Sequence, residues 1–196
     1  MRNAPEHTKE KIVVAATKLF SEQGIHRVSF QQIATKVGIS QPALYKHVAD
    51  RDDLLRLCVI DAAAKGRQLI DSNIDLYSSA SQQIRSYIEG NFIWVDKFPK
   101  EAKVLFSIYY FGYHSQAIRE ILTEINQQSV SRIGIRISAG KREGLWGVAN
   151  VAEAARVIHD LTLSEIFKAL HAKDDITVKQ RTDLVWRASE KILMSF

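Results

Sequence analysis

Side chains that can read the edges of DNA bases follow a short turn near residue 40. The amide of Gln41 can pair with an adenine edge, and Lys46 can reach a guanine or a phosphate. Between them, Pro42 and Ala43 offer small apolar contacts to a thymine methyl group. An exposed glutamine or lysine on a helix is usually only solvated. This chemistry therefore needs elements that aim the side chains into a groove.

The residues around this turn predict two short helices. Ser29 and Gln32 have the spacing of a capping box, which starts the first helix. Gly38 favours the left-handed turn that ends it, and Ser40 can cap the second helix. Leu44 would face the core and pack the second helix against it. Two short helices joined by a tight glycine turn form a helix-turn-helix, whose second helix can lie in a major groove.

Three further side chains could hold the DNA backbone. Tyr45 and His47 can donate hydrogen bonds to phosphate oxygens, which set register rather than sequence. Arg51 adds charge at the start of the next helix, where backbone amides already favour phosphate. Tyr45 could also close the small domain as a half-buried ring. His47 alone could be a metal ligand or a catalytic base, but no Cys, His or carboxylate partner sits at ligand spacing.

The basic charge is concentrated in the same part of the chain. The 196 residues carry a net charge of +5, and residues 1–51 hold eight Lys and Arg against four Asp and Glu. Neutralisation of DNA phosphates would require such a placement. Charge alone is weak evidence, because many basic faces are only solvated surface.

Helical spacing of apolar residues continues through the rest of the chain and predicts an all-α fold of about nine helices. Caps support three of the starts, at Asp50, at Asn150 with Glu153 and at Thr177 with Gln180. A flexible loop is expected around the glycines 140, 144 and 147. The expected helices are 6–23, the two short ones, 50–72, one ending near 98, 100–113, 115–140, 150–171 and 177–194.

The first fifty-odd residues resemble the DNA-binding domain of the TetR family of bacterial transcription regulators. The family pattern is matched by Ile12, Ala16, Leu19, Phe20, Gly24, Ser29, Ile33, Ala34, Gly38, Ile39, Ser40, Leu44, Tyr45, His47, Arg51 and Leu54. Val48 departs from the phenylalanine of most members, although the tetracycline repressor also carries valine there. The signal covers roughly a quarter of the chain, and its many spaced matches make it specific.

The resemblance implies a helix-turn-helix domain over residues 1–50 and a helical effector-binding and dimerisation domain over 51–196. It implies DNA contacts by the candidates above and by Ser29, and Gln31 matches a base-contacting position of the tetracycline repressor. A polar residue in a first helical turn is also often only surface. The implied partners are double-stranded palindromic operator DNA and a second copy of the chain, packed through the last two helices.

An aromatic concentration forms the second candidate site. These rings could simply form the hydrophobic core of a helical bundle. Alternatively, several of them could line a cavity that binds an apolar or aromatic small molecule. The sequence does not separate the two. The residues that would line such a cavity are Phe92, Phe106, Tyr109, Tyr113, His114 and Trp146.

Several classes of function lack support in the sequence. No nucleophile–base pair, phosphate-cradling glycine loop or metal cluster is visible, so we expect no enzyme, no catalytic residue, no metal and no cofactor. Cys58 is the only cysteine and sits among apolar neighbours, which favours a core thiol. The N-terminus lacks the apolar centre of a signal peptide, and no run is long enough to span a bilayer. We therefore expect a soluble, cytoplasmic protein.

The leading hypothesis is a transcriptional regulator, most often a repressor in this family, that a small-molecule effector releases from palindromic DNA. The alternative is a helix-turn-helix protein without such an effector, regulated by a protein partner or constitutively bound to DNA. Either would act as a DNA-binding protein.

Overall fold

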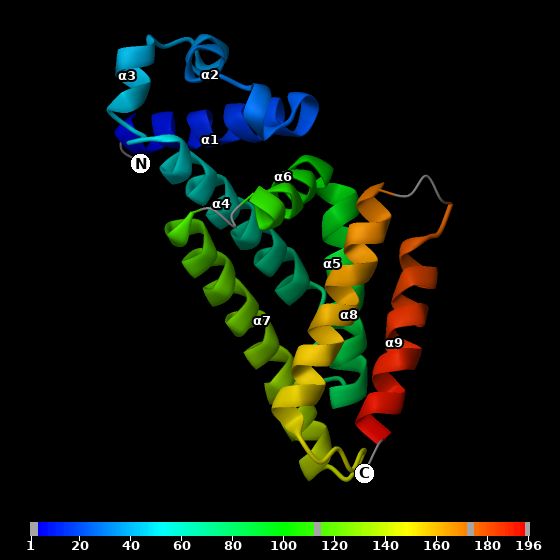
Figure 1. Ribbon diagram of the computed structural model, residues 1–196. Coiled ribbons are helices and arrows are strands. Elements are labelled where there is room, and N and C mark those ends of the chain that lie inside the picture. Colours follow the sequence, from blue (N-terminus) through cyan, green and yellow to red (C-terminus); the bar gives the residue numbers. More distant parts are fainter. Residues whose placement is uncertain (1–3, 112–114, 172–174, 195–196) are drawn as a thin grey trace. The chain divides into compact units, whose positions relative to one another are not determined.

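The computed structural model describes residues 4–111, 115–171 and 175–194, and it is all-α over these ranges (Figure 1). Nine α-helices and one 3₁₀ turn account for the regular structure of the described residues, as the sequence predicts. The elements are α1 (Ala4–Gln23), η1 (Ile25–Arg27), α2 (Phe30–Val37), α3 (Gln41–Tyr45), α4 (Arg51–Ser72), α5 (Ala80–Lys97), α6 (Pro99–Phe111), α7 (Gln116–Arg142), α8 (Val151–His171) and α9 (Val178–Met194).

The helices pack into two compact units. The first comprises residues up to 64 with residues 98–123, and the second comprises residues 65–97 with residues 124–196. In the first unit α1 contacts α2 and η1, and it also contacts α6. Packing therefore groups α6 with the N-terminal helices. The functional division at residue 50 is a different kind of boundary and stays a prediction.

The first unit has a dense apolar core built at the expected helical spacings. Cys58 lies in it with 1% of its surface exposed, which confirms a buried thiol. The largest apolar side chains of this core are fully buried and come from α1, α2, α3, α4, α6 and the start of α7: Ile12, Ile33, Leu44, Leu54, Ile108 and Ile118.

The second unit is a helical bundle in which α5, α8 and α9 run side by side (Figure 1). Its centre is filled by Ile84, Tyr87 and Phe92 of α5, which are all at most 2% exposed. Asp71 at the end of α4 forms an ion pair with Arg132 of α7. The bundle thus combines an apolar interior with an ion pair between α4 and α7.

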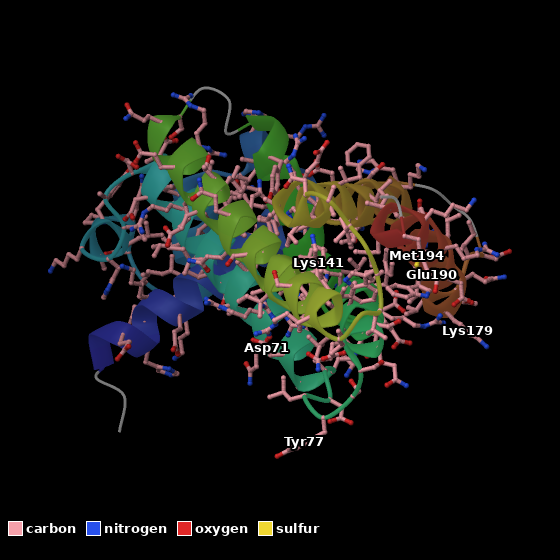
Figure 2. All side chains as sticks on the ribbon, turned by 90° about the horizontal axis from the view of Figure 1, so that it is seen from below. Asp71, Tyr77, Lys141, Lys179, Glu190 and Met194 are labelled. Carbon is pink, nitrogen blue, oxygen red and sulfur yellow. The ribbon has the colours of Figure 1, made fainter. Side chains whose placement is uncertain are left out.

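The connection between α4 and α5 contains a cap that the sequence reading missed. Ser79 accepts from the amide of Gln82 at 3.2 Å, and Gln82 accepts from the amide of Ser79 at 3.2 Å, as in a capping box. The same connection carries the fully exposed ring of Tyr77, which projects away from the ribbon (Figure 2).

The end of α7 differs from the expected flexible loop. The helix continues through Gly140 to Arg142, and Gly144 then takes a left-handed conformation at φ 75°. Gly140 is buried because the ring of Trp146 lies against the helix at that residue. A side chain at 140 would occupy the space of that ring, so the glycine serves packing rather than flexibility.

Candidate nucleic-acid interface

The predicted capping box starts α2 with both of its hydrogen bonds in place. The Ser29 hydroxyl accepts from the amide of Gln32 at 3.2 Å, and the Gln32 side chain accepts from the amide of Ser29 at 2.7 Å. Both bonds satisfy amides that a helix start leaves without partners. The Ser29 oxygen is therefore committed to the helix, and its side chain lies exposed beside the turn.

The turn after α2 has the conformation that its glycine permits. Gly38 adopts φ 80° and ψ 32°, and its amide donates to the carbonyl of Ala34 at 3.0 Å. A side chain would strain this left-handed backbone. Ser40 then caps α3 by accepting from the amide of Ala43 at 3.2 Å. Local hydrogen bonds thus form the turn between the two helices and the start of the second.

Helix α3 presents its polar residues outward because Leu44 anchors its inner face. Leu44 is fully buried, while Pro42 and Lys46 are exposed and Gln41 and Ala43 are half-buried. The helix is only five residues long, and Lys46 closes it as the C-cap. Every side chain that was expected to read bases from this helix therefore shares one accessible surface.

Residues of α2 and the end of α3 flank this surface. Gln31 is exposed, and its amide donates to the Thr35 hydroxyl at 3.3 Å. The Tyr45 ring is 49% exposed, and its centroid lies 5.2 Å from that of Phe30, so it combines a packing contact with an accessible hydroxyl end. His47 is half-buried after the end of α3. All three side chains are at least partly exposed to solvent.

Arg51 is turned inward, unlike the other candidates. Its guanidinium donates to the backbone carbonyl of Val28 at 3.0 Å and to the backbone carbonyl of Ile25. The guanidinium carbon also lies 5.7 Å from the centre of the Phe20 ring. This geometry departs from the phosphate contact that the resemblance implies, because the guanidinium is engaged by the protein itself.

The start of α4 contains a carboxylate, that of Asp53, with hydrogen-bond partners on both of its oxygens. The Asp53 side chain accepts from the amide of Ala49 at 3.1 Å and from the Arg56 guanidinium at 2.8 Å. Burial opposes ionisation of Asp53, but these hydrogen bonds and the nearby positive charges of Arg56 and Lys9 lower its pKa below the usual value. Asp50 caps the helix as predicted, accepting from the amide of Asp53 at 2.8 Å.

The residues expected to line an effector cavity divide between the two units. Phe106 and Tyr109 of α6 are half-buried in the first unit, with ring centroids 5.8 Å apart. Phe92 and Trp146 are buried in the second unit, and the Trp146 indole donates to the carbonyl of Ile137 at 2.9 Å. Those two rings are packed as core. The side chains of the other two candidates, Tyr113 and His114, lie outside the described residues.

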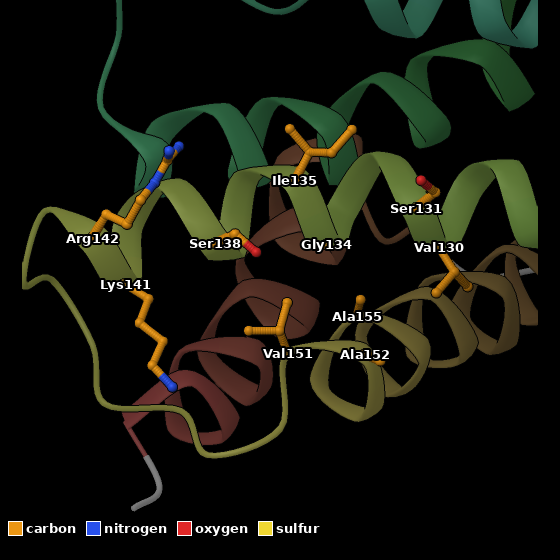
Figure 3. Close-up of a pocket in the computed structure, with 10 residues that line it drawn as sticks. All are labelled: Val130, Ser131, Gly134, Ile135, Ser138, Lys141, Arg142, Val151, Ala152 and Ala155. Carbon is orange, nitrogen blue, oxygen red and sulfur yellow. The ribbon is translucent and has the colours of Figure 1, made fainter.

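A groove of about 880 Å³ lies along α7 and the start of α8 (Figure 3). Small residues form much of its surface, among them Gly134, Ala152 and Ala155, and two lysine or arginine residues line it without any carboxylate. Lys141 and Arg142 point to opposite sides of the end of α7 (Figure 3). The Lys141 amine donates to a backbone carbonyl, that of Val148, at 2.7 Å. Sequence reading missed this groove because small residues give little periodic signal.

Helices α8 and α9 are joined by a buried ion pair. Glu165 and Arg181 are 5% exposed each, and their charged atoms lie 2.7 Å apart. Within the last two helices, through which the resemblance implies packing of a second copy, Ile158 and Val185 are buried within the chain. The remaining exposed apolar side chains of these helices include Phe167, Leu184 and Met194, the last of which lies with Glu190 on α9 (Figure 2).

Among the residues that the structure describes, no group of His, Cys, Asp and Glu could hold a metal ion. No helix in those same ranges is long and apolar enough to cross a membrane.

The N-terminal region of the chain is similar to a known protein family. Residues 12–58 match the model of bacterial regulatory proteins of the tetR family. An HTH-type transcriptional regulator of Staphylococcus aureus (strain USA300) is 28% identical over 92 residues, which cover 47% of this chain and 44% of the relative. The chain thus matches less than half the length of that curated relative.

Solved structures extend the similarity of fold to the whole chain. A protein described as a transcriptional regulator from Saccharomonospora viridis, solved in complex with choline, has a TM-score of 0.85 at 16% identity, covering 97% of this chain and 100% of that one. A regulator from Pseudomonas aeruginosa PAO1 has a TM-score of 0.84 at 16% identity, with coverages of 97% and 93%. At such identities the likeness shows the fold.

The family matched by residues 12–58 consists of bacterial regulatory proteins, in agreement with the predicted DNA-binding domain. The many spaced matches, the capped α2, the left-handed Gly38 turn and the all-helical fold agree with one another. Residues 12–58 therefore match the helix-turn-helix domain of the tetR family of bacterial regulatory proteins, and the chain as a whole shares its fold with solved transcriptional regulators.

Proposed function

We propose that this protein binds palindromic double-stranded DNA as a homodimer and regulates transcription, acting as a repressor. The observation that carries the proposal is the surface of α3, where Leu44 holds the helix down and the polar residues face outward. A five-residue helix with its neighbouring turns fits within a major groove.

The side chains on this surface have separate roles. Gln41 and Lys46 read base edges, with Pro42 and Ala43 making apolar contacts to thymine methyl groups. Gln31 reaches a base from α2. Tyr45 and His47 contact phosphates and so fix the register of the protein on the duplex, and Ser29 supports them through the capped first turn of α2.

The homodimer uses the exposed apolar side chains of α8 and α9. Phe167 is 52% exposed, Leu184 is 48% exposed and Met194 is 50% exposed, so this pair of helices has apolar area left to bury. A two-fold axis through the two helices would form a four-helix bundle. Each half-site of a palindrome would then be bound by the α3 of one copy.

A small-molecule effector would release the DNA. The relative from Saccharomonospora viridis was solved with choline, which supports an effector for this chain as well. The groove along α7 and α8 offers room for one, since its volume lies within the range of small-molecule sites. Lys141 and Arg142 line it without a carboxylate, so a neutral or anionic apolar molecule suits it better than a cation such as choline.

Selection of preferred sites from random duplexes tests this function. The expected result is an inverted repeat whose half-sites are separated by about one turn of DNA. Repeating the selection with pools of metabolites should reveal a molecule that lowers recovery of the same site. Recovery of unrelated sequences without a shared half-site would contradict sequence-specific regulation.

A further inference from the structure

The first turn of α4 holds the start of the reading unit, which we define as α2, α3 and the turn between them. Arg51 reaches across 23 residues of sequence to the carbonyl of Val28 at 3.0 Å, and its other terminal nitrogen donates to the carbonyl of Ile25. Val28 directly precedes Ser29, the N-cap of α2. The fork of the guanidinium thus fixes the backbone that leads into α2.

The same turn of α4 holds the end of the reading unit. Asp53 accepts from the amide of Ala49, four residues after the end of α3, at 3.1 Å. The Arg56 guanidinium donates to the other oxygen of Asp53 at 2.8 Å and keeps that carboxylate oriented. Two residues of one helical turn therefore hold the chain on both sides of the reading unit.

The contacts of Arg51 are those of a residue with a structural role rather than those of a residue that binds a phosphate from solvent. Ile25 and Val28 are 3% and 2% exposed, so the carbonyls that Arg51 meets belong to a buried turn. The Phe20 ring lies within cation–π range of the guanidinium. To reach a phosphate, the side chain would have to give up two charge-assisted hydrogen bonds and this ring contact.

We propose that Arg51 and Asp53 are positioning residues that clamp the two ends of the reading unit to α4, and that Arg51 does not contact DNA phosphate. The inference rests on the proposed DNA-binding function. The family resemblance implies that Arg51 contacts DNA. We infer instead that its guanidinium keeps α2 and α3 in position.

Substitution by lysine separates the two roles of Arg51. Lysine keeps the charge and binds phosphate well as a point charge, but it lacks the planar fork that spans two carbonyls. The assay is fluorescence anisotropy with the selected duplex, as a function of salt concentration. We expect Arg51→Lys and Arg51→Ala each to lose about tenfold or more in affinity, since hydrogen bonds to charged groups are among the stronger ones.

The salt dependence provides the matched control. Lys46→Ala removes an exposed cation that can neutralise a DNA phosphate as well as reach a base, and it should lower the slope of log K against log salt by about one. Both Arg51 variants should keep the slope of the parent protein. Parent-like affinity of Arg51→Lys, or a slope lowered by about one in Arg51→Ala, would overturn the inference.

Hydrogen exchange tests the clamp without DNA. In Arg51→Lys, amides of residues 25–33 should exchange about tenfold faster, while those of α9 should be unchanged and the far-UV circular dichroism should remain helical. Unchanged exchange over 25–33 would refute the clamp. If instead the parent protein selects no DNA sequence, the proposed function fails, and this exchange experiment still decides whether Arg51 holds the start of α2.

Discussion

Replacement of Gly140 by alanine tests how the end of α7 is packed. An added Cβ would lie 2.1 Å from one carbon of the Trp146 ring and 2.5 and 2.7 Å from two others. Real side chains do not approach so closely, so the ring would have to move. The ring is 7% exposed, and its indole nitrogen donates to the carbonyl of Ile137 at 2.9 Å. Movement would therefore also break a buried hydrogen bond.

The magnitude follows from three terms of known size. Forcing extra volume into a packed core costs about 1–3 kcal/mol. Loss of the Trp146 hydrogen bond adds about 1 kcal/mol. Against these, alanine is favoured over glycine within a helix by about 1 kcal/mol. We expect a net destabilisation of about 2 kcal/mol, which for a chain of this size lowers Tm by about 4–8 °C.

Gly134 supplies the matched control because it lies in the same helix with room for a side chain. A Cβ there would meet Ala155 at 3.8 Å and Val151 at 3.9 Å, which are ordinary contacts. Gly134→Ala should therefore stabilise the protein by about 0.5–1 kcal/mol. Thermal melts followed by circular dichroism at equal protein concentration measure both variants. Equal stability of the Gly140→Ala protein and the parent would refute the assigned packing of Trp146.

Further predictions concern the interface, the assembly and the response to pH. Gln41→Ala should relax base preference at one position of each half-site by about 1–3 kcal/mol, as site selection would show; unchanged preference would remove Gln41 from base reading. Leu184→Asp should shift sedimentation toward the monomer, whereas Leu76→Asp, at a 73% exposed loop residue, should not. Burial lowers the pKa of His159 below 6.5, despite the opposing charge of Asp160, so the folded protein resists protonation. Stability contributed by neutral His159 is present above pH 6.5 and is lost as pH falls through the lowered pKa. Urea titrations between pH 7 and 5 should therefore show a smaller loss of unfolding free energy for His159→Gln than for the parent protein.

Local features of the fold could be predicted because neighbouring residues determine them. The capping boxes of Ser29 and Thr177 need only the residue three positions on, and both form as expected. The left-handed turn at Gly38 likewise depends on one missing side chain. These signals locate the reading unit, and Leu44 fixes which face of α3 is hidden.

Features that depend on distant residues could not be predicted. The inward direction of Arg51 is set by carbonyls more than 20 residues away, which become available only once the turn before α2 has packed. Gly140 suggested a loop in the sequence. In the structure it lies within α7, and the ring of Trp146, a residue after the end of that helix, occupies the space where a side chain at 140 would be. For the same reason, the sequence could not separate core aromatics such as Phe92 from rings that line a cavity.

The central claim is that the outward face of α3 recognises a DNA sequence. Its most direct test is the affinity of the parent protein for the selected duplex and for a scrambled duplex of equal length, measured by anisotropy at one physiological salt concentration. We expect at least about 10³-fold tighter binding to the selected site. Equal affinity for both duplexes would mean that the protein binds only phosphate charge, and it would contradict the claim.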